Sequence, residues 1–242
     1  PHPICKSGGE FMKEKTAALS FGQFFARWMR LRRDDMLAML LFPAGFWLLI
    51  LAVVLVAAAV EGEPFDASAF AIPTAMALVG GVFAGFITGM GSAGVCFTLT
   101  VCWGHSRRQG VASLWLGGIL YSAANLLLAV LLQRAGMLIC LAAGVQSGFD
   151  LLPLVPPVLW LLLLVAPTAG AVLVKASLRR FGPKAGSWLY LIFMVACIGI
   201  PNLDNVAGVD LRPALFALLG AALAAAAVES SIWLLRAPVG GD

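Results

Sequence analysis

The chain has 242 residues, of which 61% are apolar and only 12% are charged. Soluble domains carry roughly 25% charged residues, and a soluble fold of this length cannot bury so much apolar surface. The composition therefore excludes an ordinary soluble protein and predicts a helical membrane protein, because lipid surrounds apolar helices without penalty. The net charge of +4 arises from short basic clusters between apolar runs. That pattern is typical of membrane topology signals rather than of nucleic-acid binding.

The first residues read PHPICKSGGEF and are followed by Met12. We expect residues 1–11 to be the remnant of an expression tag. The cysteines show no CxxC spacing, so the sequence predicts neither a disulfide framework nor a metal site; they are Cys5, Cys96, Cys102, Cys140 and Cys197.

An aromatic and basic segment lies within residues 12–35, before the first apolar run. Ser20 is expected to cap its helix. The large apolar side chains recur at helical spacing on one face, while arginines occupy the other faces; the segment comprises Phe21, Phe24, Phe25, Trp28 and Met29 with Arg27 and Arg30. We predict an amphipathic elbow helix lying in the membrane interface. The alternative is a cytoplasmic extension of the first transmembrane helix.

Six apolar runs follow, and each is predicted to be a transmembrane helix; they cover residues 36–60, 70–103, 111–132, 151–174, 187–200 and 213–235. Together they form a six-helix transmembrane domain over residues 36–236, and residues 237–242 form a tail. The fifth run is short and needs flanking residues to span the bilayer. Several prolines are expected to kink helices or to mark their ends; these are Pro73, Pro153, Pro156, Pro157 and Pro167.

The lysines and arginines alternate in number from loop to loop, which sets the predicted orientation. Only Arg134 and Arg212 fall on one side. Thirteen fall on the other side, namely Lys13, Lys15, Arg27, Arg30, Arg32, Arg33, Arg107, Arg108, Lys175, Arg179, Arg180, Lys184 and Arg236. We therefore predict that both termini are cytoplasmic.

Two features inside the apolar runs are candidates for function. Gly81, Gly85 and Gly89 form a GxxxGxxxG stripe, which lets helix backbones approach closely. The stripe serves either packing within the chain or a subunit or translocation interface. Glu229 is the one carboxylate well inside an apolar run. It either belongs to a substrate or gating path or is a snorkelling or neutralised residue hydrogen-bonded with Ser230 or Ser231.

The sequence contains almost no residues in the patterns typical of catalytic sites. His105 is the only histidine outside the suspected tag, and Ser92 lies in GMGSAG, where Met90 replaces the first glycine of a GxSxG elbow. No GxxxxGK[ST] phosphate-binding loop is present. We predict no catalytic residue, no metal ligand and no intrinsic enzyme activity.

The short basic turn after the second run carries the one resemblance to a known family. Its residues are Gly104, His105, Ser106, Arg107, Arg108 and Gln109. The first five match the "G-[VH]-[ST]-R-[RK]" element that ends the second span of ABC-2-type transporter permeases, and the aromatic and basic segment matches their elbow helix. The chain resembles these permeases over roughly residues 16–236, mostly in architecture. The segment at 202–212 is shorter than the re-entrant outer helices of many members.

The resemblance implies a permease subunit of an ATP-driven exporter in the cytoplasmic membrane of a prokaryote. It implies that the turn at 104–110 is a coupling element for a separate ATP-binding subunit, which would hold the ATP and Mg²⁺. It also implies a second permease subunit as partner. The alternatives are a secondary transporter or channel without ATP, a non-transporting assembly subunit, and, least favoured, an intramembrane enzyme.

Overall fold

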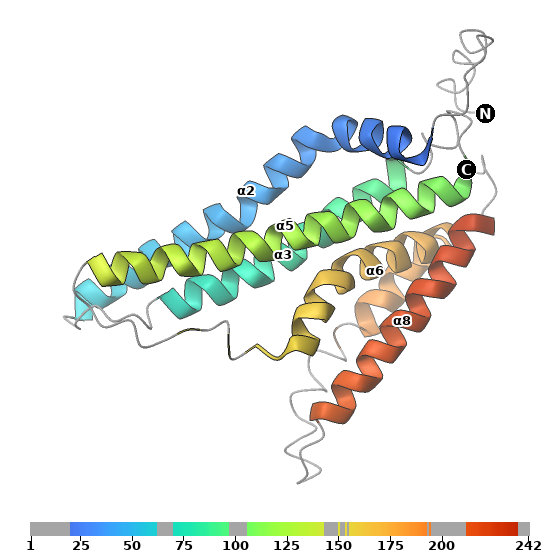
Figure 1. The fold of residues 1–242 in the computed structure, drawn as a ribbon. Helices are drawn as coiled ribbons and strands as arrows, with labels where there is room; N and C mark the ends of the chain where they lie inside the picture. The colour runs from blue at the N-terminus through green and yellow to red at the C-terminus, as the bar shows by residue number, and fades with distance from the viewer. Residues whose placement is uncertain are drawn as a thin grey trace. The chain divides into compact units, whose positions relative to one another are not determined.

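The computed structural model describes residues 20–61, 70–96, 106–142, 150, 153, 155–192, 194 and 212–236. In this part of the chain every long element is a helix, and none is a strand. The elements are α2 (Phe21–Glu61), α3 (Ala71–Gly91), the π-helical turn η2 (Ser92–Cys96), α5 (Arg107–Ala142), α6 (Pro157–Phe181) and α8 (Arg212–Arg236) (Figure 1). Residues 184–192 are also helical.

Four of the described helices are long and apolar enough to cross a membrane: Phe21–Val60, Ala71–Gly94, Arg107–Ala142 and Pro157–Phe181. They coincide with the first four predicted runs, and they support a multi-pass helical membrane protein. The sixth predicted run is helical as α8. Half of the fifth lies outside the described residues. The count of six spans and the cytoplasmic placement of both termini stay predictions.

The predicted elbow helix is continuous with the first predicted span. α2 runs unbroken over 41 residues and contains Pro43. The proline interrupts no more than a local hydrogen bond, since the helix continues on both sides. At about 1.5 Å per residue, α2 is about 60 Å long, roughly twice the thickness of the hydrocarbon core. Part of it must therefore tilt or lie outside the core, and an interfacial placement of its first turns stays a prediction.

The ends of α6 are set by local chemistry. The fourth apolar run is predicted to start at residue 151, but the helix begins at Pro157, where a proline costs no hydrogen bond. The amide of Leu159 donates to the Pro156 carbonyl oxygen at 2.9 Å. At the other end Gly182 adopts a φ of 72°, and its amide donates to the Leu178 carbonyl oxygen at 2.9 Å. A left-handed glycine of this kind ends a helix without strain.

The described helices belong to two compact units, each assembled from stretches far apart in sequence. Unit 1 comprises Pro1–Arg30, Met90–Trp115 and Ala169–Asp242. Unit 2 comprises Leu31–Gly89 and Leu116–Thr168. α2, α3, α5 and α6 each contribute to both units. The six-helix transmembrane domain over residues 36–236 stays a prediction.

The core of unit 2 is built where small residues meet aromatic ones. Trp47 and Phe70 stack with ring centroids 6.0 Å apart, and they pack with the buried Ala77 and Cys140. The Trp47 indole nitrogen Nε1 donates to Thr74 Oγ1 at 3.3 Å. A Cβ on Gly136 would lie 2.6 Å from Phe70 Cδ1. α5 can therefore approach this aromatic pair only because residue 136 has no side chain.

Candidate functional site

The first turn of α5 is fixed by a reciprocal cap. The Ser106 amide donates to Gln109 Oε1 at 3.3 Å, and the Gln109 amide donates to Ser106 Oγ at 3.3 Å. This capping box satisfies amides that have no partner within the helix. Two of the predicted coupling residues, Gly104 and His105, lie outside the described residues.

The two adjacent arginines of the predicted coupling element have different surroundings. Arg107 is half-buried, and its Nη1 donates to the Leu235 backbone oxygen at 3.0 Å. It thereby satisfies a carbonyl in the last turn of α8 that has no partner in its own helix. Arg108 is exposed. Arg107 therefore joins two helices within unit 1, and Arg108 is the cation presented at the surface.

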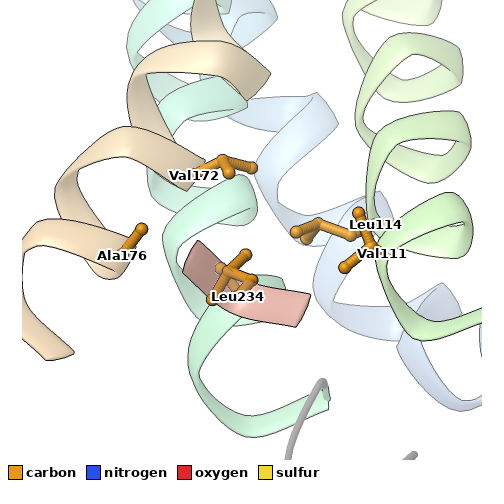
Figure 2. Packing of buried hydrophobic residues seen from close by; sticks show 6 residues of the cluster. Val111, Leu114, Val172, Ala176 and Leu234 are labelled. Carbon is orange, nitrogen blue, oxygen red and sulfur yellow. The ribbon is translucent and has the colours of Figure 1, made fainter. Parts of the chain in front are cut away.

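Behind this first turn lies the apolar core of unit 1. It is formed by side chains of α5, α6 and α8 together with Ala93, and Figure 2 shows Val111, Leu114, Val172, Ala176 and Leu234. Leu114 and Leu234 are 2% and 1% exposed. Trp115 Nε1 donates to Ser231 Oγ at 2.9 Å, which adds a second polar link between α5 and α8. The start of α5 and the end of α8 are therefore held together by side-chain packing and by two hydrogen bonds.

The turn η2 within the second predicted span belongs to the same unit. The turn η2 carries Gly94, whose backbone oxygen accepts a hydrogen bond from Arg179 Nη2 at 3.4 Å. A Cβ on Gly94 would lie 3.4 Å from Lys175 Nζ. Arg179 and Lys175 of α6 therefore both lie beside Gly94.

These contacts gather basic residues at one end of unit 1. We call this region the basic end and define it by Arg107, Arg108, Lys175, Arg179, Arg180 and Arg236. All six belong to segments for which the charge pattern predicts the cytoplasmic side. The structure brings together residues from loops that are far apart in sequence, as a shared membrane face requires.

Glu229 is exposed and lines a cleft of about 620 Å³ between the ends of α6 and α8. The cleft is also lined by Arg179, Arg180 and Arg236. The neighbouring serines do not hold the carboxylate. Ser230 Oγ donates to the Ala226 backbone oxygen, and Ser231 Oγ donates to that of Ala227 at 2.8 Å. The predicted alternative of a carboxylate hydrogen-bonded to these serines finds no support in these contacts.

The residues predicted for the elbow helix form the start of α2. Ser20 caps it as predicted, because its Oγ accepts from the Gln23 amide at 3.4 Å and Gln23 Oε1 accepts from the Ser20 amide at 3.4 Å. The aromatic face is only partly available to lipid. Phe24 and Trp28 are buried at 2% and 3% exposure, Phe25 and Met29 are half-buried, and Phe21 and Arg30 are exposed.

The glycine stripe packs inside unit 2. A Cβ on Gly81 would lie 3.3 Å from Asn125 Cβ, and one on Gly85 would lie 3.0 Å from Pro167 Cβ. Gly89 is buried as well. These contacts favour packing within the chain over an intersubunit role for Gly81 and Gly85. The tightest glycine was missed, since a Cβ on Gly118 would clash with Thr168 Oγ1.

The sequence analysis also missed a buried cation in unit 2. Arg32 was assigned to a cytoplasmic segment, but it is 6% exposed and its Nη1 donates to the Thr88 backbone oxygen at 3.1 Å. Other polar atoms are buried nearby in the same unit. Ser122 Oγ, Asn125 Oδ1 and Thr168 Oγ1 have no hydrogen-bond partner among the described residues. Asn125 lies inside the apolar run at 111–132, and a polar residue in such a run could have predicted this polar interior.

Among the described residues, no group of three or more His, Cys, Asp or Glu side chains could hold a metal ion. The comparisons with known proteins are likewise negative. No protein-family model, curated protein or solved structure matches the chain. Any functional conclusion therefore depends on the geometry of the basic end and on the composition of the helices.

Proposed function

We propose that the chain is the membrane-spanning permease subunit of an ATP-driven exporter of the ABC-2 type. It would reside in the cytoplasmic membrane of a prokaryote, pair with a second permease and bind a separate ATP-binding subunit. That subunit would carry ATP and Mg²⁺ and perform the hydrolysis. The chain itself would be the transport path and would not be an enzyme.

The link between the start of α5 and the end of α8 carries the proposal. The capping box fixes the first turn of α5, Arg107 holds the Leu235 carbonyl, and a buried core joins both helices to α6. A force applied at this turn is therefore passed to three helices at once instead of being absorbed by a flexible loop. Coupling between a partner and membrane helices needs such a contiguous packed connection.

Within the proposed coupling element, the arginines have separate tasks. Arg108 is exposed and would meet acidic groups on the ATP-binding subunit. Arg107 is engaged with α8 and would transmit the displacement. The basic residues of this end favour its assignment to the cytoplasmic face, where the partner would be found.

The decisive test is affinity purification in mild detergent, with the complex stabilised by crosslinking. We expect an ATP-binding subunit to co-purify at near one-to-one ratio. Arg108→Glu should lower its recovery about tenfold, because like charges would then oppose each other at the contact. Arg33→Glu is the matched control, since Arg33 is exposed and its ion pair is only with the adjacent Asp34.

Two results would end this proposal. One is an intact crosslinked complex that contains no nucleotide-binding protein. The other is unchanged recovery with Arg108→Glu. Arg107→Glu should differ from Arg108→Glu by lowering the thermal stability of the isolated subunit, because it breaks the contact to α8.

A secondary transporter without ATP is the second candidate. The observation that favours it is the polar interior of unit 2, where Arg32 is buried and Ser122, Asn125 and Thr168 expose no polar atom to solvent. Ionisable and polar side chains inside a membrane protein often mark a transport path. Uptake or efflux by the purified chain in liposomes, driven by an ion gradient alone, would favour this candidate over the first.

A further inference from the structure

The cleft between the ends of α6 and α8 has no role in the proposed coupling to an ATP-binding subunit. It has a volume of about 620 Å³, and its polar lining consists of three arginines and one glutamate. The formal charge of these four groups is +2, since three cations oppose a single anion. Apolar atoms of Ile232, Trp233 and Leu234 complete the lining. The cleft is therefore both cationic and amphipathic.

Arg180 is held in place by aromatic rings. Its guanidinium carbon Cζ lies 4.5 Å from the centroid of the Trp233 ring and 5.3 Å from that of Phe181. The two rings themselves meet edge to face at 5.7 Å. A guanidinium stacked on a ring keeps its N–H donors at the edge of its plane, where they can form paired hydrogen bonds with a phosphate.

Compensation of the helix dipole does not account for the whole arrangement. Arg179 and Arg180 occupy the last turn of α6, and Arg236 occupies the last turn of α8, where cations are favoured. That effect requires neither an aromatic support nor a shared cleft. Among the described residues, Arg180 and Arg236 have no carboxylate within ion-pair distance. The cleft therefore has positive charge that its own side chains leave unneutralised.

We propose that this cleft binds the phosphate group of an anionic phospholipid. Arg180 and Arg236 would donate to the phosphate oxygens, and Arg179 would add positive charge while holding η2 through Gly94. Ile232, which is partly exposed, would contact the glycerol and upper acyl region. Clusters of basic residues at the ends of membrane helices recognise lipid headgroups in this way.

Glu229 is expected to weaken phosphate binding in this cleft. Its carboxylate lines the same cleft and would repel a phosphate, so it limits affinity in this site instead of creating it. The proposal needs only a membrane-spanning chain. It goes beyond the coupling role and does not require an ATP-binding partner.

The experiment measures lipid binding to the full chain by native mass spectrometry in detergent, with phosphatidylglycerol as the probe. We expect Arg180→Gln combined with Arg236→Gln to raise the dissociation constant about tenfold or more, because two charge-assisted contacts are lost. Glu229→Gln should lower it several-fold, since the repulsion is removed while the side-chain shape is kept. Arg108→Gln is the control, because it removes an exposed arginine of the basic end that does not line the cleft.

Two further arms identify the source of the phosphate. Zwitterionic phosphatidylcholine should bind more weakly than phosphatidylglycerol, and excess inorganic phosphate should not displace the lipid. Complete displacement by inorganic phosphate would overturn the lipid assignment in favour of a free anion. Unchanged phosphatidylglycerol binding in the double variant, with circular dichroism showing intact helices, would overturn the site itself.

Discussion

Neighbouring residues in this chain differ in role because a helix turns by about 100° per residue. Arg107 reaches the Leu235 carbonyl, whereas Arg108 is exposed. The same separation occurs at the end of α8, where Ser230 is buried and Glu229 is exposed in the cleft. The charge pattern along the sequence therefore does not predict the task of each side chain.

Adding a single methyl group at Gly118 tests the close packing of α5 against α6. Gly118→Ala should lower the stability of the protein by about 1–3 kcal/mol, because the new methyl group would clash with the buried, β-branched Thr168. This cost exceeds the gain of up to about 1 kcal/mol that alanine offers over glycine in a helix. Thermal unfolding in detergent measures the difference.

The control for this substitution is Gly22→Ala. A Cβ there would meet no atom within 4 Å, so the change should be neutral or slightly stabilising. Equal effects at both glycines would contradict the close packing of α5 against α6 in unit 2.

The sequence predicted close packing only for glycines that recur at a regular spacing. Gly81 and Gly85 stand out because their spacing of four places them on one face. Gly118 and Gly136 make tighter approaches, yet each lacks a partner at that spacing. Their importance comes from Thr168 and Phe70 on other helices, and no pattern within α5 could reveal it.

At the scale of elements, two helices begin with the same capping motif. Both α2 and α5 are preceded by a serine with a glutamine three residues later, and both pairs form reciprocal hydrogen bonds. The sequence analysis named the cap at Ser20 but treated Ser106 as part of a family element. The local chemistry of caps is readable from sequence because it involves residues three apart.

Removing the cap of α5 should loosen its first turn. Ser106→Ala should cost about 1 kcal/mol, because the Gln109 amide loses its acceptor. Hydrogen exchange of residues 107–110 should become faster, while that of the middle of α5 should not change. Ser106→Asp should restore protection, since aspartate also caps helices and suits the positive end of the dipole. Faster exchange with both variants would argue against the capping role.

The length of α5 was not predicted, whereas the unbroken course of α2 agrees with the alternative in which the aromatic and basic segment extends the first span. The apolar run at 111–132 marks what the hydrocarbon core requires, but α5 continues to Ala142 and is about 54 Å long. Its extension includes Arg134, whose Nη1 lies 3.0 Å from Asp150 Oδ2. Hydropathy detects the part of a helix that contacts lipid. It does not indicate how far the helix continues into the polar residues beyond that part.

At the scale of the whole molecule, the structure groups the helix segments into two compact units. Composition and apolar runs correctly predict a multi-pass helical protein. They contain no information on which parts of long helices pack together, since that depends on contacts such as Gly85 with Pro167 and Leu114 with Leu234. The division therefore had to come from the structure.

The two units predict a localised response to core damage. Leu234→Ala should destabilise unit 1 by about 2–5 kcal/mol, because it leaves a cavity among Leu114, Val172 and Ala176. Hydrogen exchange should rise in residues 107–115 and 169–181 more than in residues 71–89. Leu218→Ala on the same helix is the control, since Leu218 is 68% exposed. A uniform rise across both units would contradict their independence.

The order of the helices of unit 1 along the chain also has a consequence for biogenesis, because α8, which carries Leu234 and Leu235, follows α5 and α6. Ribosomes release the chain from its N-terminus, so α5 and α6 enter the membrane before α8 has been made. Until then Arg107 lacks its carbonyl acceptor, Trp115 lacks Ser231, and the apolar pocket around Val172 is open. Unit 1 is thus completed only when α8 has been synthesised. A chain that stops before α8 would present an unfinished core to the quality-control proteases of its membrane.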